Sequence, residues 1–146
     1  MSDDNNIFKP ASDEELEQRK KTAPKIMLQE WLDAFLKRKD IHENEDGSYD
    51  VDESIHLNKM MLKEIPVKFR EVGGNFQVSY NSLATLKNAP TYVGGVFTCS
   101  DNKLTSLEGA PKEVGLHFWC GSNSKQFTEE DVKKVSDVKG VILNWL

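Results

Sequence analysis

The sequence lacks the features of several familiar protein classes. It contains no run of the roughly 18 apolar residues that a membrane-spanning helix needs, so we expect no membrane partner. Only two cysteines occur among 146 residues, and a chain of this length can bury a core without disulfides, so we expect reduced thiols. Residues 1–6 are polar and acidic where a secretory leader would be basic and then apolar, which predicts a cytoplasmic protein.

Clustered positive charge is also missing. The chain has 19 basic and 24 acidic side chains, and the bases are scattered among the acids. A phosphate-binding surface needs clustered lysine and arginine, so direct binding to nucleic acid is disfavoured. Residues 1–53 hold 15 acids against 8 bases, whereas residues 54–146 hold 9 acids against 11 bases. The acidity therefore belongs to the N-terminal third, which stays compatible with a basic protein partner.

No catalytic or metal-binding spacing stands out. There is no Ser-His-Asp, Cys-His or phosphate-loop pattern, so we predict a protein without enzymatic activity and without a cofactor. The acidic stretch 42–53 matches an EF-hand loop at four positions, but His42 stands where a hard oxygen ligand is required. We interpret the stretch as an acidic hairpin that turns at Asp46 and Gly47, and we predict no metal site.

What the sequence does contain is a repeat of 21 residues. Two columns of identical residues define it, namely Phe76, Phe97 and Phe118, and then Asn81, Asn102 and Asn123. A glycine pair precedes the first two phenylalanines, and an Ala-Pro pair ends the same two repeats. A more degenerate copy begins near Ile55. Such a period is typical of architectures in which each unit buries its apolar face against its neighbours.

Each repeat carries the string apolar-x-apolar-x-x-Asn-x-Leu, which predicts a short strand with alternate residues pointing inward. We therefore predict an α+β fold, a short leucine-rich-repeat-like β-solenoid of three to four parallel strands. The phenylalanines and asparagines should form buried ladders, with the asparagine amides bonding to backbone groups that the turns leave unpaired. The glycine pairs are expected to supply positive φ angles, and the Ala-Pro segments to be non-helical returns.

The N-terminal flank is expected to cover one apolar end of the array. An amphipathic helix is predicted over residues 24–38, with Pro24 in its first turn. A separate polar helix, capped at Ser12, is predicted over residues 12–22.

The C-terminal flank is expected to cover the other end. Thr128 should cap a helix over residues 129–136, and residues 138–145 should return as an apolar strand, with Trp145 and Leu146 packed. The predicted organisation has four parts: a disordered tail (1–10), a helical and hairpin cap (11–53), the solenoid (54–125), and a helix-strand cap (126–146).

The strings from Asp101 to Pro111 and from Val93 to Gly95 resemble leucine-rich-repeat-like proteins of large tailed bacteriophages and some bacteria. The resemblance extends over roughly residues 40–142. It departs at two positions, Leu116 and Lys125, where the pattern has glycine and leucine. It implies the repeat fold and recognition of another protein, and it does not specify which one.

The outward side chains of the strands are the candidate partner-binding residues. If the phenylalanines point inward, their neighbours should form an outer face made of His56, Asn75, Gln77, Ser79, Val96, Thr98, Ser100, His117 and Trp119. Asn58 is expected to extend this face beside His56. A tryptophan exposed on a sheet is a candidate anchor, unless the C-terminal segment folds over it.

Cys99 and Cys120 occupy the same inward column in adjacent repeats. His117 lies at the opposite parity, so the three residues do not point the same way as metal ligands would. We therefore interpret both thiols as small buried hydrophobes.

Three functional hypotheses remain open. The first is a phage protein that binds and modulates a host or phage enzyme through the outer face of the sheet, in the cytoplasm of the infected bacterium. The second places binding on acidic segments 12–21 and 40–53, which would compete with nucleic acid for a basic groove on a nucleic-acid enzyme. The third is a structural or virion-associated component.

Overall fold

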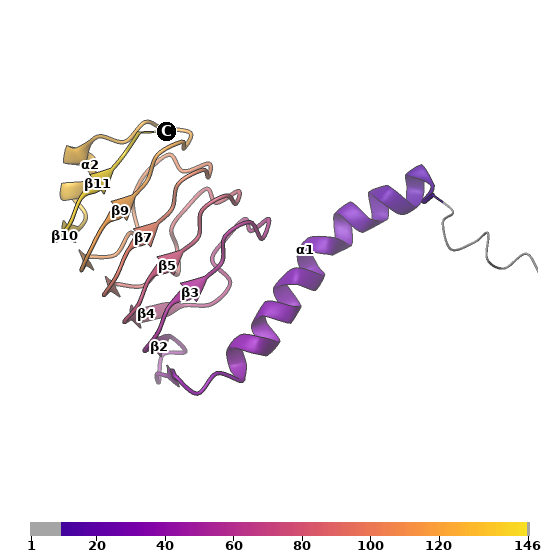
Figure 1. Cartoon of the computed structure of the whole chain (residues 1–146), viewed down its shortest axis with the longest axis horizontal. Helices are drawn as coiled ribbons and strands as arrows, with labels where there is room; N and C mark the ends of the chain where they lie inside the picture. Colours follow the sequence, from indigo (N-terminus) through magenta and orange to yellow (C-terminus); the bar gives the residue numbers. More distant parts are fainter. Residues whose placement is uncertain (1–9, 146) are drawn as a thin grey trace, which may run out of the picture.

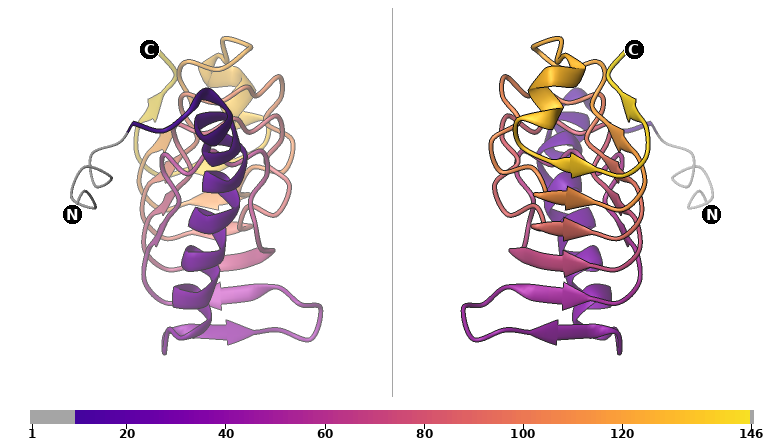
Figure 2. Two further views of the ribbon diagram at one scale, coloured as in Figure 1. Left: turned by 90° about the vertical axis from the view of Figure 1, so that its right-hand side faces the viewer. Right: turned by 90° about the vertical axis from the view of Figure 1, so that its left-hand side faces the viewer.

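The chain forms a parallel β-solenoid of about five turns, preceded by one long helix (Figure 1). The computed structural model describes residues 10–145, so the predicted disorder of residues 1–10 concerns a segment that lies almost wholly outside the described residues. Successive coils repeat every 21 residues and stack one above another like rungs (Figure 2). Each coil contributes one short strand to each of two sheets.

The first sheet has five parallel strands in the order β11-β9-β7-β5-β3. Its members are β3 (Ile55–His56), β5 (Phe76–Gln77), β7 (Phe97–Thr98), β9 (Phe118–Trp119) and β11 (Ile142–Leu143). The prediction of three to four strands was therefore slightly low. The repeat continues through β11, whose sequence no longer carries the phenylalanine and asparagine that mark the other copies.

The second sheet lies on the return side of the coils, where only the hairpin was predicted to form strands. Its order is β1-β2-β4-β6-β8-β10, and all its pairs are parallel except the antiparallel hairpin β1-β2. The strands are β1 (Ile41–Glu43), β2 (Tyr49–Val51), β4 (Phe69–Val72), β6 (Tyr92–Val93), β8 (Glu113–Val114) and β10 (Asp137–Val138). The hairpin turns at Gly47, with φ of 84°, as predicted.

The signal for this second sheet is a column of valines, because a buried valine closes β2, β4, β6 and β8. The last coil is three residues longer than the others, with a spacing of 24 between His117 and Val141. The extra length accommodates α2 (Glu129–Lys133), which starts with the predicted cap at Thr128 and a capping box to Asp131. It is shorter than expected, and residues 138–145 make a strand, a turn and a strand rather than a single strand.

The two helices predicted at the N-terminus form one continuous helix, α1 (Asp13–Leu36). Pro24 lies inside this helix and not in a first turn. Because proline has no backbone N–H, one helical hydrogen bond is missing at this position. Only Phe35 is buried, and Leu28 and Trp31 pack partly against the core. From this anchored end the helix runs beside the first coil, where Leu28 borders a hollow with Met60, and its N-terminal part extends beyond the coils (Figure 1).

The phenylalanines form one continuous aromatic column through the coils. Ring centroids of Phe76 and Phe97 are 6.0 Å apart, and those of Phe97 and Phe118 are 5.0 Å apart. The column continues from Phe76 to Phe69 at 5.1 Å, and from Phe69 to Phe35 of α1 at 5.8 Å. All are buried, so this predicted ladder is confirmed and extends to the helix.

The hydrogen bonds of the asparagine ladder are also confirmed, and they join each coil to the one before it. Only Asn102 is buried, however, and Asn81 and Asn123 are half-buried. Asn102 Oδ1 accepts from Leu83 N of the preceding coil at 3.0 Å. Its Nδ2 donates to Val78 O of that coil at 2.9 Å and to Cys99 O of its own coil at 3.2 Å. The other two asparagines make equivalent bonds. Each ladder asparagine therefore supplies hydrogen-bond partners to backbone groups that the turn would otherwise leave unpaired.

The glycine pairs do not supply positive φ angles, and that prediction was wrong. Glycine is needed because the coils stack closely: a Cβ at Gly94 would lie 2.3 Å from Gly73 O, and one at Gly115 would lie 2.2 Å from Gly94 O. The left-handed conformation occurs instead in the residue directly before each ladder asparagine, namely Tyr80, Asp101 and Ser122, with φ of 54° to 57°. Lys59, with φ of 57°, holds the same position before Met60, which stands in the asparagine column.

Substituting Asn102 with alanine should strongly destabilise the solenoid. The change leaves Leu83 N and Val78 O buried without their partner, so the free energy of unfolding should fall by roughly 2–4 kcal/mol. Urea denaturation followed by circular dichroism measures this. Thr105→Ala, an exposed change in the same coil, is the control and should stay within about 0.5 kcal/mol of the parent.

A pair of variants tests the explanation that close stacking of the coils, and not a positive φ angle, requires glycine at these positions. Gly94→Ala forces a methyl group against the neighbouring backbone and should cost at least about 2 kcal/mol. Lys59→Gly places glycine, which adopts positive φ angles without steric cost, at an exposed left-handed position. The free energy of unfolding should change by less than about 1 kcal/mol in either direction. Equal stability of the Gly94→Ala variant and the parent would contradict the close-stacking account.

Candidate functional site

A hollow of about 340 Å³ opens on the outer face of the five-stranded sheet. It is lined by side chains from five consecutive coils, namely Asn58, Gln77, Ser79, Tyr80, Thr98, Ser100, Asp101, Trp119, Leu143 and Trp145. Because the parallel strands are in register, residues 21 positions apart lie side by side across the hollow. The site is therefore built by stacking rather than by one loop.

Three exposed aromatic rings stand around the hollow. Trp119 on β9 is 40% exposed, Tyr80 is 56% exposed and Trp145 is 62% exposed. The C-terminal segment runs beside Trp119, with Leu143 as its register partner, and does not cover it. The prediction that Trp145 packs was wrong, and Leu146 lies outside the described residues. Exposed aromatics that converge on a rigid sheet are the usual anchors of binding surfaces.

Polar groups without partners lie between the rings. Within residues 10–145 the Asp101 side chain makes no ion pair and no hydrogen bond, although its backbone N–H donates to Gly121 O. Gln77 Oε1 accepts from Asn58 Nδ2 at 2.8 Å, and Asn58 Oδ1 accepts from Ser79 N at 2.7 Å. These bonds orient the Gln77 amide and leave its Nε2 available to a bound molecule.

Thr98 lies at the floor of the hollow. It stands between Gln77 and Trp119 in the neighbouring strands, and these larger side chains leave it only 6% exposed. Its hydroxyl is buried and has no hydrogen-bond partner in the described part of the chain. A buried hydroxyl without a partner lowers stability, and proteins that keep one often use it in binding.

The structure brings together five of the nine candidate partner-binding residues in this hollow: Gln77, Ser79, Thr98, Ser100 and Trp119. Ser79 and Thr98 are buried rather than exposed as expected. His56 continues the row on β3, where it is exposed. The remaining three candidates precede the strands and lie in the turns: Asn75, Val96 and His117.

Two of those turn residues join adjacent coils. Asn75 Oδ1 accepts from Val96 N at 2.8 Å, and His117 Nδ1 accepts from Val141 N at 2.9 Å. Strict alternation assigned them to the outer face, but each strand is only two residues long, so the alternation does not extend into the turn. Their observed contacts are therefore structural.

Sequence reasoning missed four lining residues, namely Tyr80, Asp101, Leu143 and Trp145, whereas Asn58 was expected to extend the outer face. A signal for two of them was present, because Tyr80 and Asp101 each directly precede a ladder asparagine and so share a column. Leu143 and Trp145 belong to the last coil, which the repeat pattern alone does not reveal.

The cysteines are part of the core, as predicted. Cys99 and Cys120 are buried and free. Burial raises the pKa of the Cys99 thiol well above its usual value, and it raises the pKa of Cys120 to about 11. Both sulfurs are therefore protonated at neutral pH, which is the unreactive form.

Three of the seven carboxylates in the acidic segment 40–53 make ion pairs within the chain. Asp40 accepts two bonds from Arg38, at 2.8 and 2.7 Å, and Asp50 accepts from Arg70 at 2.9 Å. These guanidinium bonds lower the pKa of both carboxyl groups. Asp46 accepts from Ser48 at 2.6 Å, which with Lys68 lowers its pKa too. The hairpin is therefore less free to pair with a basic partner than its composition suggests.

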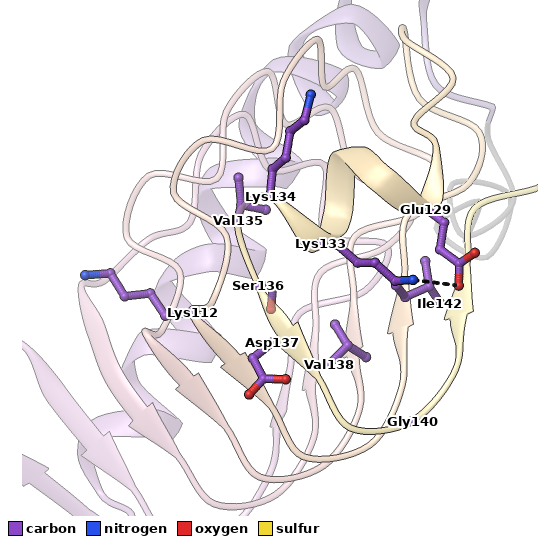
Figure 3. A pocket seen from close by; sticks show the side chains of 10 residues that line it. All are labelled: Lys112, Glu129, Lys133, Lys134, Val135, Ser136, Asp137, Val138, Gly140 and Ile142. Carbon is purple, nitrogen blue, oxygen red and sulfur yellow. Dashed lines mark ion pairs between the residues drawn. The ribbon is translucent and has the colours of Figure 1, made fainter.

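A second hollow, of about 660 Å³, lies at the C-terminal end of the array (Figure 3). Lys112, Lys133 and Lys134 border it, but Figure 3 shows them pointing in different directions rather than converging. Lys133 lies 4.0 Å from Glu129. An anion would need several donors aimed at one point, so this arrangement is not an anion site.

Comparison with protein-family models, curated proteins and solved structures yields no match. Within residues 10–145 no helix has the length and apolar character to cross a membrane. The same residues contain no group of three or more His, Cys, Asp or Glu side chains placed to hold a metal ion.

Replacing Thr98 with valine should stabilise the protein, because a methyl group takes the place of the unpartnered hydroxyl. The expected gain in the free energy of unfolding is about 1–2 kcal/mol. Thr98→Ser keeps the hydroxyl, loses the methyl and should be less stable than the parent. Thermal unfolding of the three proteins measures the order, and a less stable valine variant would show that the hydroxyl has a partner in solution.

Proposed function

We propose that this chain is a non-enzymatic protein-binding module, and that it binds its partner through the outer face of the five-stranded sheet. The observation that supports the proposal is the hollow around Trp119, where three exposed aromatic rings surround unpartnered polar groups. Aromatic anchors in a partly desolvated pocket carry most of the energy in protein interfaces.

The fold supports the same proposal through its rigidity. The lining residues lie on strands of the five-stranded sheet or within three residues of one, and the three inner strands are each hydrogen-bonded to both neighbouring coils. A surface that is ordered before binding loses little conformational entropy on association. A short solenoid therefore offers a preformed recognition face despite its small size.

The resemblance to repeat proteins of tailed phages supports a more specific form of the proposal. In that form the partner is a host or phage enzyme in the cytoplasm of an infected bacterium, and binding modulates its activity. Competition for a basic groove by the acidic segments ranks second, because Arg38, Lys68 and Arg70 already pair with the hairpin carboxylates.

Site-specific crosslinking in the native cell tests which face binds. A photoreactive benzoylphenylalanine in place of Tyr80 should yield a discrete adduct that mass spectrometry identifies, whereas the same residue in place of Lys87 on the return side should not. The identified partner is then titrated with purified variants. Trp119→Ala should weaken binding at least about tenfold, as expected for a central anchor.

The matched control is Leu116→Ala, which removes an exposed apolar side chain from the same coil outside the hollow. It should bind within about twofold of the parent. Equal binding by the Trp119→Ala variant, or a complex that crosslinks only through α1 and the hairpin, would reject the sheet-face proposal.

A further inference from the structure

We propose that the hollow on the sheet receives a cationic side chain of the partner, with an arginine guanidinium as its best occupant. This inference rests on the proposed function and specifies the chemistry of its central contact. It follows from the charge of the lining, the geometry of the aromatic rings and the position of Asp101.

The charge of the lining favours a cation. Asp101 is the only charged residue among the ten that line the hollow, so no lysine, arginine or histidine of residues 10–145 lines it. Lys59, the nearest base in the same column, stands two coils away, about 10 Å by the usual strand spacing. An arriving cation therefore meets one carboxylate that makes no ion pair with a described residue, whereas the Lys59 Nζ lies over the Tyr80 ring and is not part of the lining.

The aromatic rings add to this preference. The faces of tryptophan and tyrosine carry negative electrostatic potential, and a cation over such a face is stabilised further when water is excluded. The chain already makes this contact once: Lys59 Nζ lies 5.4 Å from the centroid of the Tyr80 ring. Trp119 and Trp145 make no such contact with a base of the described residues, so their faces remain available.

Asp101 is held in place before any ligand arrives. Its backbone N–H donates to Gly121 O at 3.0 Å, and the next residue is the buried ladder Asn102. With φ of 55° the residue has a left-handed backbone, which turns its side chain out of the strand. A carboxylate positioned by the ladder loses little freedom when it binds a cation.

Arginine suits this lining better than lysine. A planar guanidinium stacks on indole rings and carries five N–H donors, which match a carboxylate in bidentate fashion. The hydroxyl of Ser100, which is only half-buried, makes no side-chain hydrogen bond in the described residues and adds a further acceptor beside Asp101. A neutral sugar would also stack on the rings, but its binding would not depend on the charge of Asp101.

The experiment titrates the full-length protein with short peptides while recording the indole N–H signals by two-dimensional NMR. The probes are acetyl-Gly-Arg-Gly-amide and the same peptide with citrulline, which keeps the planar shape and loses the charge. The arginine peptide should shift the Trp119 and Trp145 signals and leave the Trp31 signal of α1 unchanged. Citrulline should bind at least about tenfold more weakly.

Two variants provide matched controls. Asp101→Asn keeps the shape of the side chain, and asparagine tolerates the left-handed backbone. This variant should bind the arginine peptide about tenfold more weakly than the parent. Glu108→Gln removes one exposed negative charge from the same coil outside the hollow and should have no such effect. Equal affinities for arginine and citrulline, or shifts produced by cellohexaose in place of the arginine peptide, would overturn the inference.

The outcome can be distinguished from failure of the proposed function. If the identified protein partner binds the Asp101→Asn variant as tightly as the parent but binds the Trp119→Ala variant much more weakly, the sheet face binds protein without a cation in the hollow. If the Trp119→Ala variant also keeps its affinity, the proposed function itself fails.

Discussion

The structure depends on hydrogen bonds between equivalent positions of successive coils. Because every coil has the same backbone path, the N–H and C=O groups of one coil meet those of the next in register, and each ladder asparagine closes the gaps at the turn. The glycine columns exist because this stacking is so close that a methyl group would meet the neighbouring carbonyl oxygen. The aromatic column fills the space enclosed by the backbone.

The sequence was sufficient to predict the solenoid, its period and its two ladders, because those features depend on identical residues that recur at a fixed spacing. It was less informative where the same backbone is built from different residues. The second sheet rests on buried valines in strands of only two to four residues, and the last coil replaces phenylalanine with Ile142. Pro24 indicated a helix start, but the helix continues through it.

The candidate site was predicted in part for a related reason. Strict alternation correctly placed the residue that follows each ladder phenylalanine on the outer face, and these residues line the hollow, including Gln77 and Trp119. The same rule failed in the turns, where Asn75 and His117 bond to adjacent coils. Asp101 and Tyr80 came into the site through a left-handed backbone, which a pattern of apolar and polar residues does not encode.

The long helix has a consequence for the motion of the whole molecule. At 1.5 Å per residue, the 24 residues of α1 extend for about 36 Å, yet only its C-terminal half, through Leu28, Trp31 and Phe35, packs against the core. A molecule with such a projecting helix is not spherical, and its frictional coefficient is larger than that of a compact sphere of 16.6 kDa. Rotational diffusion is therefore anisotropic, with the slowest tumbling for rotation of the arm end over end.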